Sequence, residues 1–176
     1  MPAIFIGRFQ PLHKGHLKAI KWLFKKEKEI LIVIGSIDKS SMRNNLFSFG
    51  ERKNMIERTL STANIKNYKI YGVKDYSNDI FWAKKVLRMA KLLPKEAIVY
   101  TQNPWTADCF KKIKVKVKSH PLFFNRLSAT QVRRKIVENK KWENLVPKTV
   151  FDFLVKINGE KRIKALPSRA TSTKVL

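Results

Sequence analysis

Residues 7–23, GRFQPLHKGHLKAIKWL, decide the fold of this chain. They follow a short apolar run at residues 3–6 and lead into apolar residues that recur with helical spacing, so we expect a strand, a turn and a helix. His13 and His16 fall on one face of the first helical turn, where free backbone N–H groups and the helix dipole favour an anion. Gly15 leaves room there for a close approach. Taken alone, the pair also fits two surface histidines at a helix start.

The composition is that of an ordinary globular domain. Of 176 residues, 44% are hydrophobic and 29% are charged, which is enough apolar material for one real core. The single cysteine, Cys109, excludes an internal disulfide and fits a reducing compartment. No apolar run reaches the length of a membrane span, and the chain passes from Met1 almost directly into the first strand, leaving no room for a signal peptide. We therefore expect a cytoplasmic protein without a membrane partner.

The charge balance is unusual. Lysine and arginine number 38 against 13 acidic residues, a formal charge of +25. Such a field attracts polyanions, so nucleic acid has to be considered as a partner. The lysines are scattered over every segment, without a basic tail or an aromatic-interleaved stripe. A general attraction for phosphate-bearing small molecules explains this pattern as well, and nucleic-acid binding is not favoured.

The rest of the chain alternates between strand and helix patterns. Strands are expected at residues 30–34, 68–73, 97–100 and 113–118, and helices at 49–61, 80–93, 105–112, from 128 onward and 147–158, the last ending at Gly159. This alternation predicts a single α/β domain over residues 1–166, a Rossmann-like doubly wound parallel sheet with a small helical C-terminal part. The polar tail at 167–176 is expected to be disordered.

A second helix start also suits an anion. Ser128 followed by Gln131 is a capping box, which by itself is only a structural signal. Thr130 and Arg133 on the first turns make this start a better anion site. In a doubly wound sheet both helix starts open at the carboxyl edge of the strands, so they are expected to face one crevice.

The residue types at these two motifs favour transfer of a phosphoryl or nucleotidyl group. The phosphate-binding patterns GxxxxGK[ST] and GxGxxG do not occur, and no serine elbow, cysteine or paired carboxylate stands near either motif. Transfer of a phosphoryl or nucleotidyl group depends mostly on positioning and on neutralising charge, which histidine and arginine can do. A phosphate monoester as attacking group is largely dianionic at neutral pH, so it needs no general base.

The two motifs together resemble a known family. GRFQPLHKGH at 7–16 is similar to the HxGH signature of the nucleotidyltransferase superfamily, in the form typical of archaeal nicotinamide mononucleotide (NMN) adenylyltransferases, and LSATQVRRKI at 127–136 resembles its second motif. The segments GSIDKS, FGER, QNP and KWENLVPK resemble those enzymes in order and approximate spacing. The resemblance implies transfer of AMP from ATP to NMN, giving NAD and pyrophosphate, with Mg²⁺. Two alternatives are another adenylyl or cytidylyl transferase of the superfamily and a basic nucleic-acid-binding protein.

The resemblance also assigns residues for ATP. His13 and His16 would bind the phosphates and stabilise charge at the α-phosphate, while Arg133 would hold the phosphates that leave. The remaining ATP-binding positions implied by the motifs are Gly7, Arg8, Phe9, Gln10, Ser128 and Thr130. Mg²⁺ would bridge the phosphates and keep most of its waters, so no protein metal ligand is expected. Relatives of this kind also suggest a homo-oligomer.

The acceptor side rests on three further residues. By resemblance, Trp82 would stack on the nicotinamide ring, although Trp82 and Val86 also lie on a helical stripe that suits the core. Asp79 stands where archaeal relatives tend to have asparagine, and a carboxylate there would disfavour nicotinic acid mononucleotide. Arg43, in the loop at 37–48, would bind the phosphate of NMN or would simply be an exposed arginine.

Overall fold

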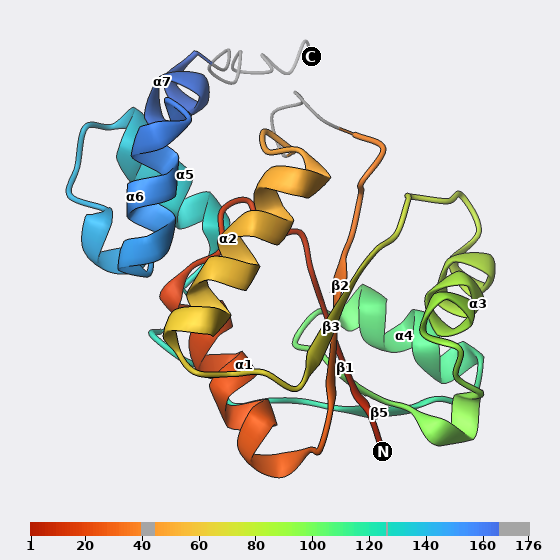
Figure 1. Ribbon diagram of the computed structural model, residues 1–176. Helices are drawn as coiled ribbons and strands as arrows, with labels where there is room; N and C mark the ends of the chain where they lie inside the picture. Colours follow the sequence, from red (N-terminus) through yellow and green to blue (C-terminus); the bar gives the residue numbers. More distant parts are fainter. Residues whose placement is uncertain (40–44, 126, 166–176) are drawn as a thin grey trace, which may run out of the picture.

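A five-stranded parallel sheet forms the centre of the molecule. The computed structural model describes residues 1–39, 45–125 and 127–165. The sheet has the order β3-β2-β1-β4-β5 (Figure 1). Its strands are β1 (Ala3–Gly7), β2 (Ile30–Ile34), β3 (Tyr68–Gly72), β4 (Ile98–Tyr100) and β5 (Lys116–Lys118). The order reverses at β1, so the predicted doubly wound sheet is confirmed.

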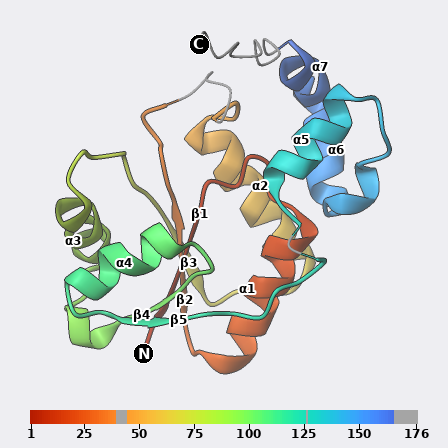
Figure 2. The same ribbon diagram turned by 180° about the vertical axis from the view of Figure 1, so that it is seen from behind.

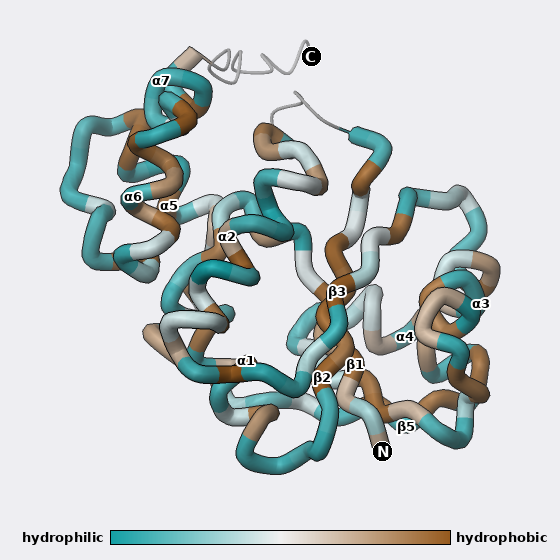
Figure 3. Tube along the Cα trace, viewed as in Figure 1, coloured by the Kyte–Doolittle hydropathy of each residue, from teal (hydrophilic) through white to brown (hydrophobic). Residues whose placement is uncertain are grey.

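The sheet is buried on both faces, as its apolar strands predict. In β1 and β2, alternate residues point to opposite sides, so Phe5 and Ile32 join one core cluster while Ile4 and Leu31 join the other. All five residues of β2 are buried. Figure 3 shows hydrophobic residues concentrated along these central strands.

Helices cover each face of the sheet. On one side lie α1 (Lys14–Lys26) and α2 (Phe49–Thr62), and on the other α3 (Asp79–Ala90) and α4 (Pro104–Lys112), as the two opposite views show (Figure 1, Figure 2). Short 3₁₀ turns lie at Pro94–Glu96 and Glu143–Leu145. These bounds agree with the expected helices to within a few residues.

Three C-terminal helices form a small unit beside α2 (Figure 1). They are α5 (Ala129–Val137), α6 (Lys148–Lys156) and α7 (Gly159–Lys164). The Thr59 and Thr149 hydroxyls lie 2.9 Å apart between α2 and α6, and Arg162 Nη1 donates to Glu51 Oε1 at 2.5 Å. Burial raises the pKa of the Glu51 carboxyl, but hydrogen bonds from Arg162 and Ser48, together with the charge of Arg162, lower it further. The predicted small helical C-terminal part is therefore attached to the main sheet layer by side-chain bonds.

Three boundaries differ from the sequence prediction. The helix predicted at 147–158 ends at Lys156, and the left-handed residue that follows it is Asn158 (φ 53°) and not Gly159. Gly159 begins α7, and a Cβ at this position would lie 2.8 Å from Leu154 Cδ2. The helix at 80–93 ends at Ala90, where Lys91 is left-handed. The edge strand keeps only three of its six predicted residues because Lys114 is also left-handed (φ 61°). Arg43 and the tail at 167–176 lie outside the described residues.

Candidate active site

The two predicted anion-binding helix starts open into one cavity of about 850 Å³. It lies at the carboxyl end of β1, where the strand order reverses and open α/β sheets bind their ligands. His13 and His16 line it from α1, and Ser128, Thr130 and Arg133 line it from α5. The sequence-based expectation that both motifs face one crevice is confirmed.

His13 and His16 cap the first helix reciprocally. His16 donates its backbone N–H to His13 Nδ1 at 3.4 Å, and His13 donates its backbone N–H to His16 Nδ1 at 3.3 Å. The two rings stack with their centroids 3.6 Å apart. Because each Nδ1 accepts a hydrogen bond, the neutral tautomer of each ring carries its proton on Nε2. The arrangement leaves two ring N–H donors for a ligand.

Both rings are neutral at physiological pH. Burial lowers the pKa of His13 to about 4, and burial together with the neighbouring His13 and His120 lowers the pKa of His16 well below its ordinary value. An anion at these rings would therefore meet hydrogen-bond donors and not cations. The positive charge in this cavity comes from arginine.

Acid is expected to destabilise the protein through His13. Its ordinary pKa is 6.5 and its folded pKa is about 4, so between these values the unfolded chain binds a proton that the folded chain does not. The contribution of His13 to the free energy of unfolding is complete above pH 6.5 and is lost as the pH falls toward 4. At about 1.4 kcal/mol per pKa unit, the loss amounts to about 3 kcal/mol. Urea denaturation at steps from pH 7 to 4.5 measures it. His13→Asn keeps a capping acceptor, so an equally steep loss in that variant would contradict the assignment.

Gly15→Ala is expected to reduce turnover about tenfold by displacing a histidine. A Cβ at Gly15 would lie 3.0 Å from Nδ1 and Cε1 of His13, so the ring must shift by a few tenths of an ångström. Gly50→Ala is the matched control, since a Cβ there has its nearest neighbour, Ser48 Oγ, at 4.0 Å. Steady-state rates of both variants test this, and equal rates would show that His13 tolerates the shift.

Among the described residues that line the cavity, Arg8 and Arg133 carry the positive charge. Arg133 Nη1 donates to the carbonyl of Gln10 at 2.7 Å, and its Nη2 donates to Thr130 Oγ1 at 3.3 Å. Burial and the nearby charge of Arg8 both lower the pKa of the Arg133 guanidinium. No aspartate or glutamate is among the described residues that line this cavity. Two like charges without a carboxylate between them favour a bound polyanion.

Three residues of the first motif act mainly as supports. Gln10 is 1% exposed, and its amide both donates to and accepts from the backbone of Phe47 at 2.9 Å, so its side chain is not free for a nucleotide. Phe9 is buried with its ring 4.8 Å from that of His16. A Cβ at Gly7 would lie 3.0 Å from Phe9 Cζ. Of the ATP-binding positions predicted in the first motif, Arg8 alone is exposed, and in the second motif Thr130 is exposed.

A second cavity of about 430 Å³ adjoins the first. Both cavities are lined by Ile6, Arg8 and Asn103, so they share a wall at the end of β1. Trp82 lines the second cavity, as predicted for the acceptor side, but it is only 4% exposed and belongs to the core cluster of α3 and α4. Asp79 is not brought into the lining, because its carboxylate accepts a hydrogen bond from Trp105 Nε1 at 3.2 Å.

The match to protein families agrees with this geometry. The family model described as cytidylyltransferase-like matches residues 4–135, a range that contains both helix starts and both cavities' shared wall. The chain belongs to the cytidylyltransferase-like family. The predicted membership in the nucleotidyltransferase superfamily is thereby confirmed.

Curated relatives of this cytidylyltransferase-like chain are named nicotinamide-nucleotide adenylyltransferases. A nicotinamide-nucleotide adenylyltransferase from Pyrococcus furiosus is 37% identical over 174 residues, which cover 97% of this chain and 91% of the relative. One from Thermoplasma acidophilum is 38% identical, covering 93% and 90%. A solved structure from Francisella tularensis, a bifunctional NMN adenylyltransferase/ADP ribose pyrophosphatase complexed with AMP and a manganese ion, superposes with a TM-score of 0.77 at 26% identity. That match covers 94% of this chain and 51% of the other, so this chain spans about half of the bifunctional protein.

Several cavity residues of this cytidylyltransferase-like chain were missed in the sequence. His120 lines the first cavity, with its ring 5.6 Å from Phe5. Asp75 lines the second and accepts from Ser36 Oγ at 2.8 Å. Trp105 is 47% exposed in the second cavity. Each of these residues follows the carboxyl end of a strand. That position in the sequence is the signal that could have identified them as cavity residues.

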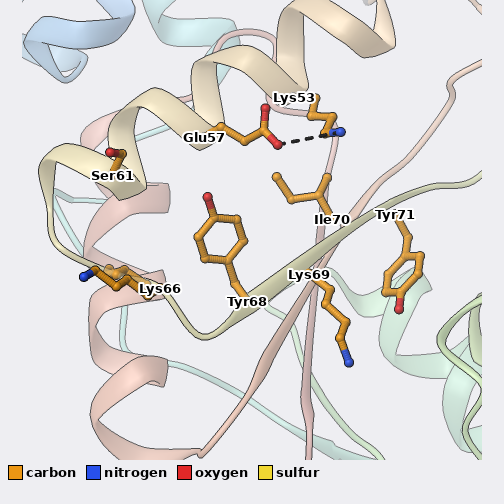
Figure 4. A pocket seen from close by; sticks show the side chains of 9 residues that line it. Lys53, Glu57, Ser61, Lys66, Tyr68, Lys69, Ile70 and Tyr71 are labelled. Atoms are coloured by element: carbon orange, nitrogen blue, oxygen red, sulfur yellow. Dashed lines mark ion pairs between the residues drawn. The ribbon is translucent and has the colours of Figure 1, made fainter.

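Outside the two cavities, the described residues form a further hollow, and they include no metal-ligand cluster and no membrane-spanning helix. A third hollow of about 670 Å³ lies at the free edge of β3, where Lys53 pairs with Glu57 at 3.6 Å (Figure 4). It contains none of the predicted site residues. In the ranges 1–39, 45–125 and 127–165, no group of three histidine, cysteine or acidic residues is placed to hold a metal. Over the same ranges, the helices lack the length and apolar character needed to cross a bilayer.

Proposed function

We propose that this chain transfers the adenylyl group of ATP to nicotinamide mononucleotide, giving NAD and pyrophosphate. The observation that carries the proposal is the pair of adjoining cavities at the end of β1, with Arg8 in their common wall. The larger cavity has neutral histidine donors and arginine cations for a polyphosphate, and the smaller has aromatic side chains for a ring. The reacting phosphates would meet beside Arg8. The names of the archaeal relatives support the same reaction.

The reaction is a single in-line displacement. An oxygen of the NMN phosphate forms a bond to the α-phosphorus of ATP, and the bond from that phosphorus to the bridging oxygen breaks, so pyrophosphate leaves with the electron pair. The Nε2–H groups of His13 and His16 would donate to oxygens that gain charge at the α-phosphate. Arg133 and Thr130 would hold the departing phosphates at the start of α5. No general base is required of the chain.

We propose Mg²⁺ as the metal, carried by the phosphates. The lining of the large cavity fits such a metal, since its described residues offer nitrogen donors and cations for the phosphates and no carboxylate for a metal held directly by the protein. When bound, Mg²⁺ neutralises phosphate charge and helps pyrophosphate to leave. His13, His16 and Arg133 then have the task of fixing the position of the nucleotide.

The pH dependence of turnover is expected to follow the acceptor and not the histidines. Because the pKa of His13 is about 4 and that of His16 is also lowered, neither ring gains a proton between pH 8 and pH 6. The second pKa of a phosphate monoester is near about 6, so turnover should fall with acid from there. Rates measured with NMN at constant ionic strength from pH 8 to 5 test this. An acidic limb centred near 7 would point to a histidine cation instead.

The proposed reaction is tested directly with purified protein, ATP and Mg²⁺. NMN, nicotinic acid mononucleotide, phosphopantetheine and glycerol phosphate are offered as separate acceptors, with CTP replacing ATP in a parallel series. NAD and pyrophosphate from the first mixture are expected. A product from another acceptor alone would favour a different transferase of the superfamily, and salt-sensitive binding of RNA or DNA without any product would favour the nucleic-acid alternative.

We also propose a cytoplasmic location and a homo-oligomer. The location rests on the single, buried Cys109, which suits a reducing compartment. The oligomer is drawn from the resemblance to the archaeal enzymes. Light scattering of the purified chain measures the subunit number, and a monomer at working concentration would contradict it.

A further inference from the structure

We propose that Arg162, on α7, is a positioning residue for the proposed ATP site. Arg162 lines neither of the two cavities. It acts on Arg133 from outside, through the segment that leads into α2 and through Gln10. This inference rests on the proposed function and adds to it a residue that lies outside both sequence motifs.

Arg162 binds the segment that leads into α2 with its whole guanidinium. Its Nη2 donates to the carbonyl of Leu46 at 2.5 Å, and its Cζ lies 5.2 Å from the centre of the Phe47 ring. Its Nη1 and Nη2 also donate to the two carboxylate oxygens of Glu51, at 2.5 and 3.2 Å. Glu51 in turn accepts the backbone N–H of Ser48 at 2.8 Å. A planar, forked cation makes these contacts together, which the single ammonium group of a lysine does not.

The same segment holds the side chain of Gln10. Gln10 Nε2 donates to the carbonyl of Phe47, and Gln10 Oε1 accepts the N–H of Phe47, both at 2.9 Å. Gln10 is 1% exposed and Phe47 is fully buried, so water does not compete for these two bonds. The backbone carbonyl of Gln10 accepts from Arg133 Nη1 at 2.7 Å. A shift of Phe47 is therefore transmitted to Arg133 through short hydrogen bonds.

Arg162 also closes a ring of contacts that includes Arg133. Helix α7, which carries Arg162, packs on α5, which carries Arg133 (Figure 2). Within α5, Arg133 Nη2 donates to Thr130 Oγ1 at 3.3 Å. Loss of Arg162 leaves this support from α5 but loosens the support from Gln10. The guanidinium of Arg133 would then lose its fixed position in a helix that still forms, and small displacements of a substrate-binding group are costly to an enzyme.

The test uses Arg162→Leu and Arg162→Lys in the full chain. KM values for ATP and NMN are measured with Mg²⁺, together with Kd for ATP by calorimetry. Arg162→Leu should raise KM and Kd for ATP about tenfold and leave KM for NMN within about twofold, because Arg133 would face the phosphates of ATP. Arg162→Lys keeps a charge beside Glu51 and should raise both ATP values about threefold. A variant that is merely less stable contains less active protein, which lowers apparent kcat and leaves both KM values unchanged.

Arg133→Lys provides the second background. It keeps a positive charge but loses the forked donors to Gln10 and Thr130. If Arg162 acts through Arg133, adding Arg162→Leu to Arg133→Lys should change KM for ATP by less than about twofold. A further tenfold rise in this background, or equal rises of KM for ATP and NMN in Arg162→Leu, would overturn the inference.

The matched control is Lys161→Leu, which removes an exposed charge from the neighbouring position of the same helix and should change none of these values. Melting temperatures identify a variant that has lost its fold, and Arg162→Lys takes the place of Arg162→Leu in that event. If the wild-type protein binds ATP but makes no dinucleotide, the proposed function fails, and Kd for ATP still decides this inference. An unchanged Kd in the folded Arg162 variants refutes it alone, whereas a wild-type protein that does not bind ATP refutes both.

Discussion

His16→Ala is expected to lower turnover by about 10²- to 10³-fold, the usual effect of removing one donor that stabilises developing charge. The ring of His16 lies between Phe9 and His13, with centroids at 4.8 and 3.6 Å, so its position is fixed before a nucleotide binds. Since the ring is neutral, its loss removes a hydrogen bond and not a charge. KM for ATP should therefore change much less than kcat.

Lys18→Ala is the matched control for this experiment. Lys18 lies exposed on the same helix and does not line either cavity. Its replacement removes a full positive charge close to the site, yet turnover should stay within about twofold because exposed charges are screened. A melting temperature for His16→Ala far below the wild-type value, with proportionate loss of folded protein, would show that the histidine is a helix cap and nothing more.

Arg52→Met is expected to produce the largest loss of stability. Arg52 is 1% exposed, and its guanidinium donates to the carbonyls of Arg8 at 3.1 Å, Gly35 at 2.7 Å, Ser36 at 3.3 Å and Ser48 at 3.2 Å. Burial lowers the pKa of Arg52 to about 10, and it stays charged at neutral pH. Methionine fills part of the space but leaves buried carbonyls without donors, at a cost of about 3 kcal/mol. The melting temperature should fall by roughly 6–12 °C.

Arg88→Met serves as the control, because Arg88 is exposed on α3. Thermal melts and turnover are measured for both variants. Arg52→Met should also impair turnover, since the carbonyls that it releases belong to residues that line the second cavity. A melting temperature within about 2 °C of wild type would mean that water replaces the guanidinium at these carbonyls.

Local patterns made the fold and the two helix starts predictable. The apolar runs of β1 and β2 and the capping boxes at His13 and Ser128 depend on neighbours in the chain, so short windows of sequence contain the information. The meeting of both starts in one cavity followed from strand order, which the alternation of elements predicts.

Features that depend on tertiary contacts could not be predicted from the sequence. Trp105 and Asp79 meet only because α3 and α4 pack together, and nothing within either segment predicts their hydrogen bond. In the sequence, Arg52 cannot be distinguished from a surface arginine of an amphipathic helix. Its burial becomes visible only in the structure, where its guanidinium donates to the carbonyl of Gly35 just after β2. The lowered pKa of His13 depends on burial of its side chain, which the local sequence does not indicate. Gly159 was predicted as the stop of the helix before it, but Asn158 takes the left-handed conformation that follows this helix and Gly159 begins α7.

The hydrogen bond from Arg133 to the carbonyl of Gln10 joins groups 123 residues apart in the chain. During synthesis, the first histidine motif leaves the ribosome long before the arginine that completes its cavity. A growing or truncated chain that lacks α5 thus has half of the proposed phosphate site. The proposed use of ATP would therefore begin only when the C-terminal helices dock onto the sheet layer. Incomplete chains would not consume ATP.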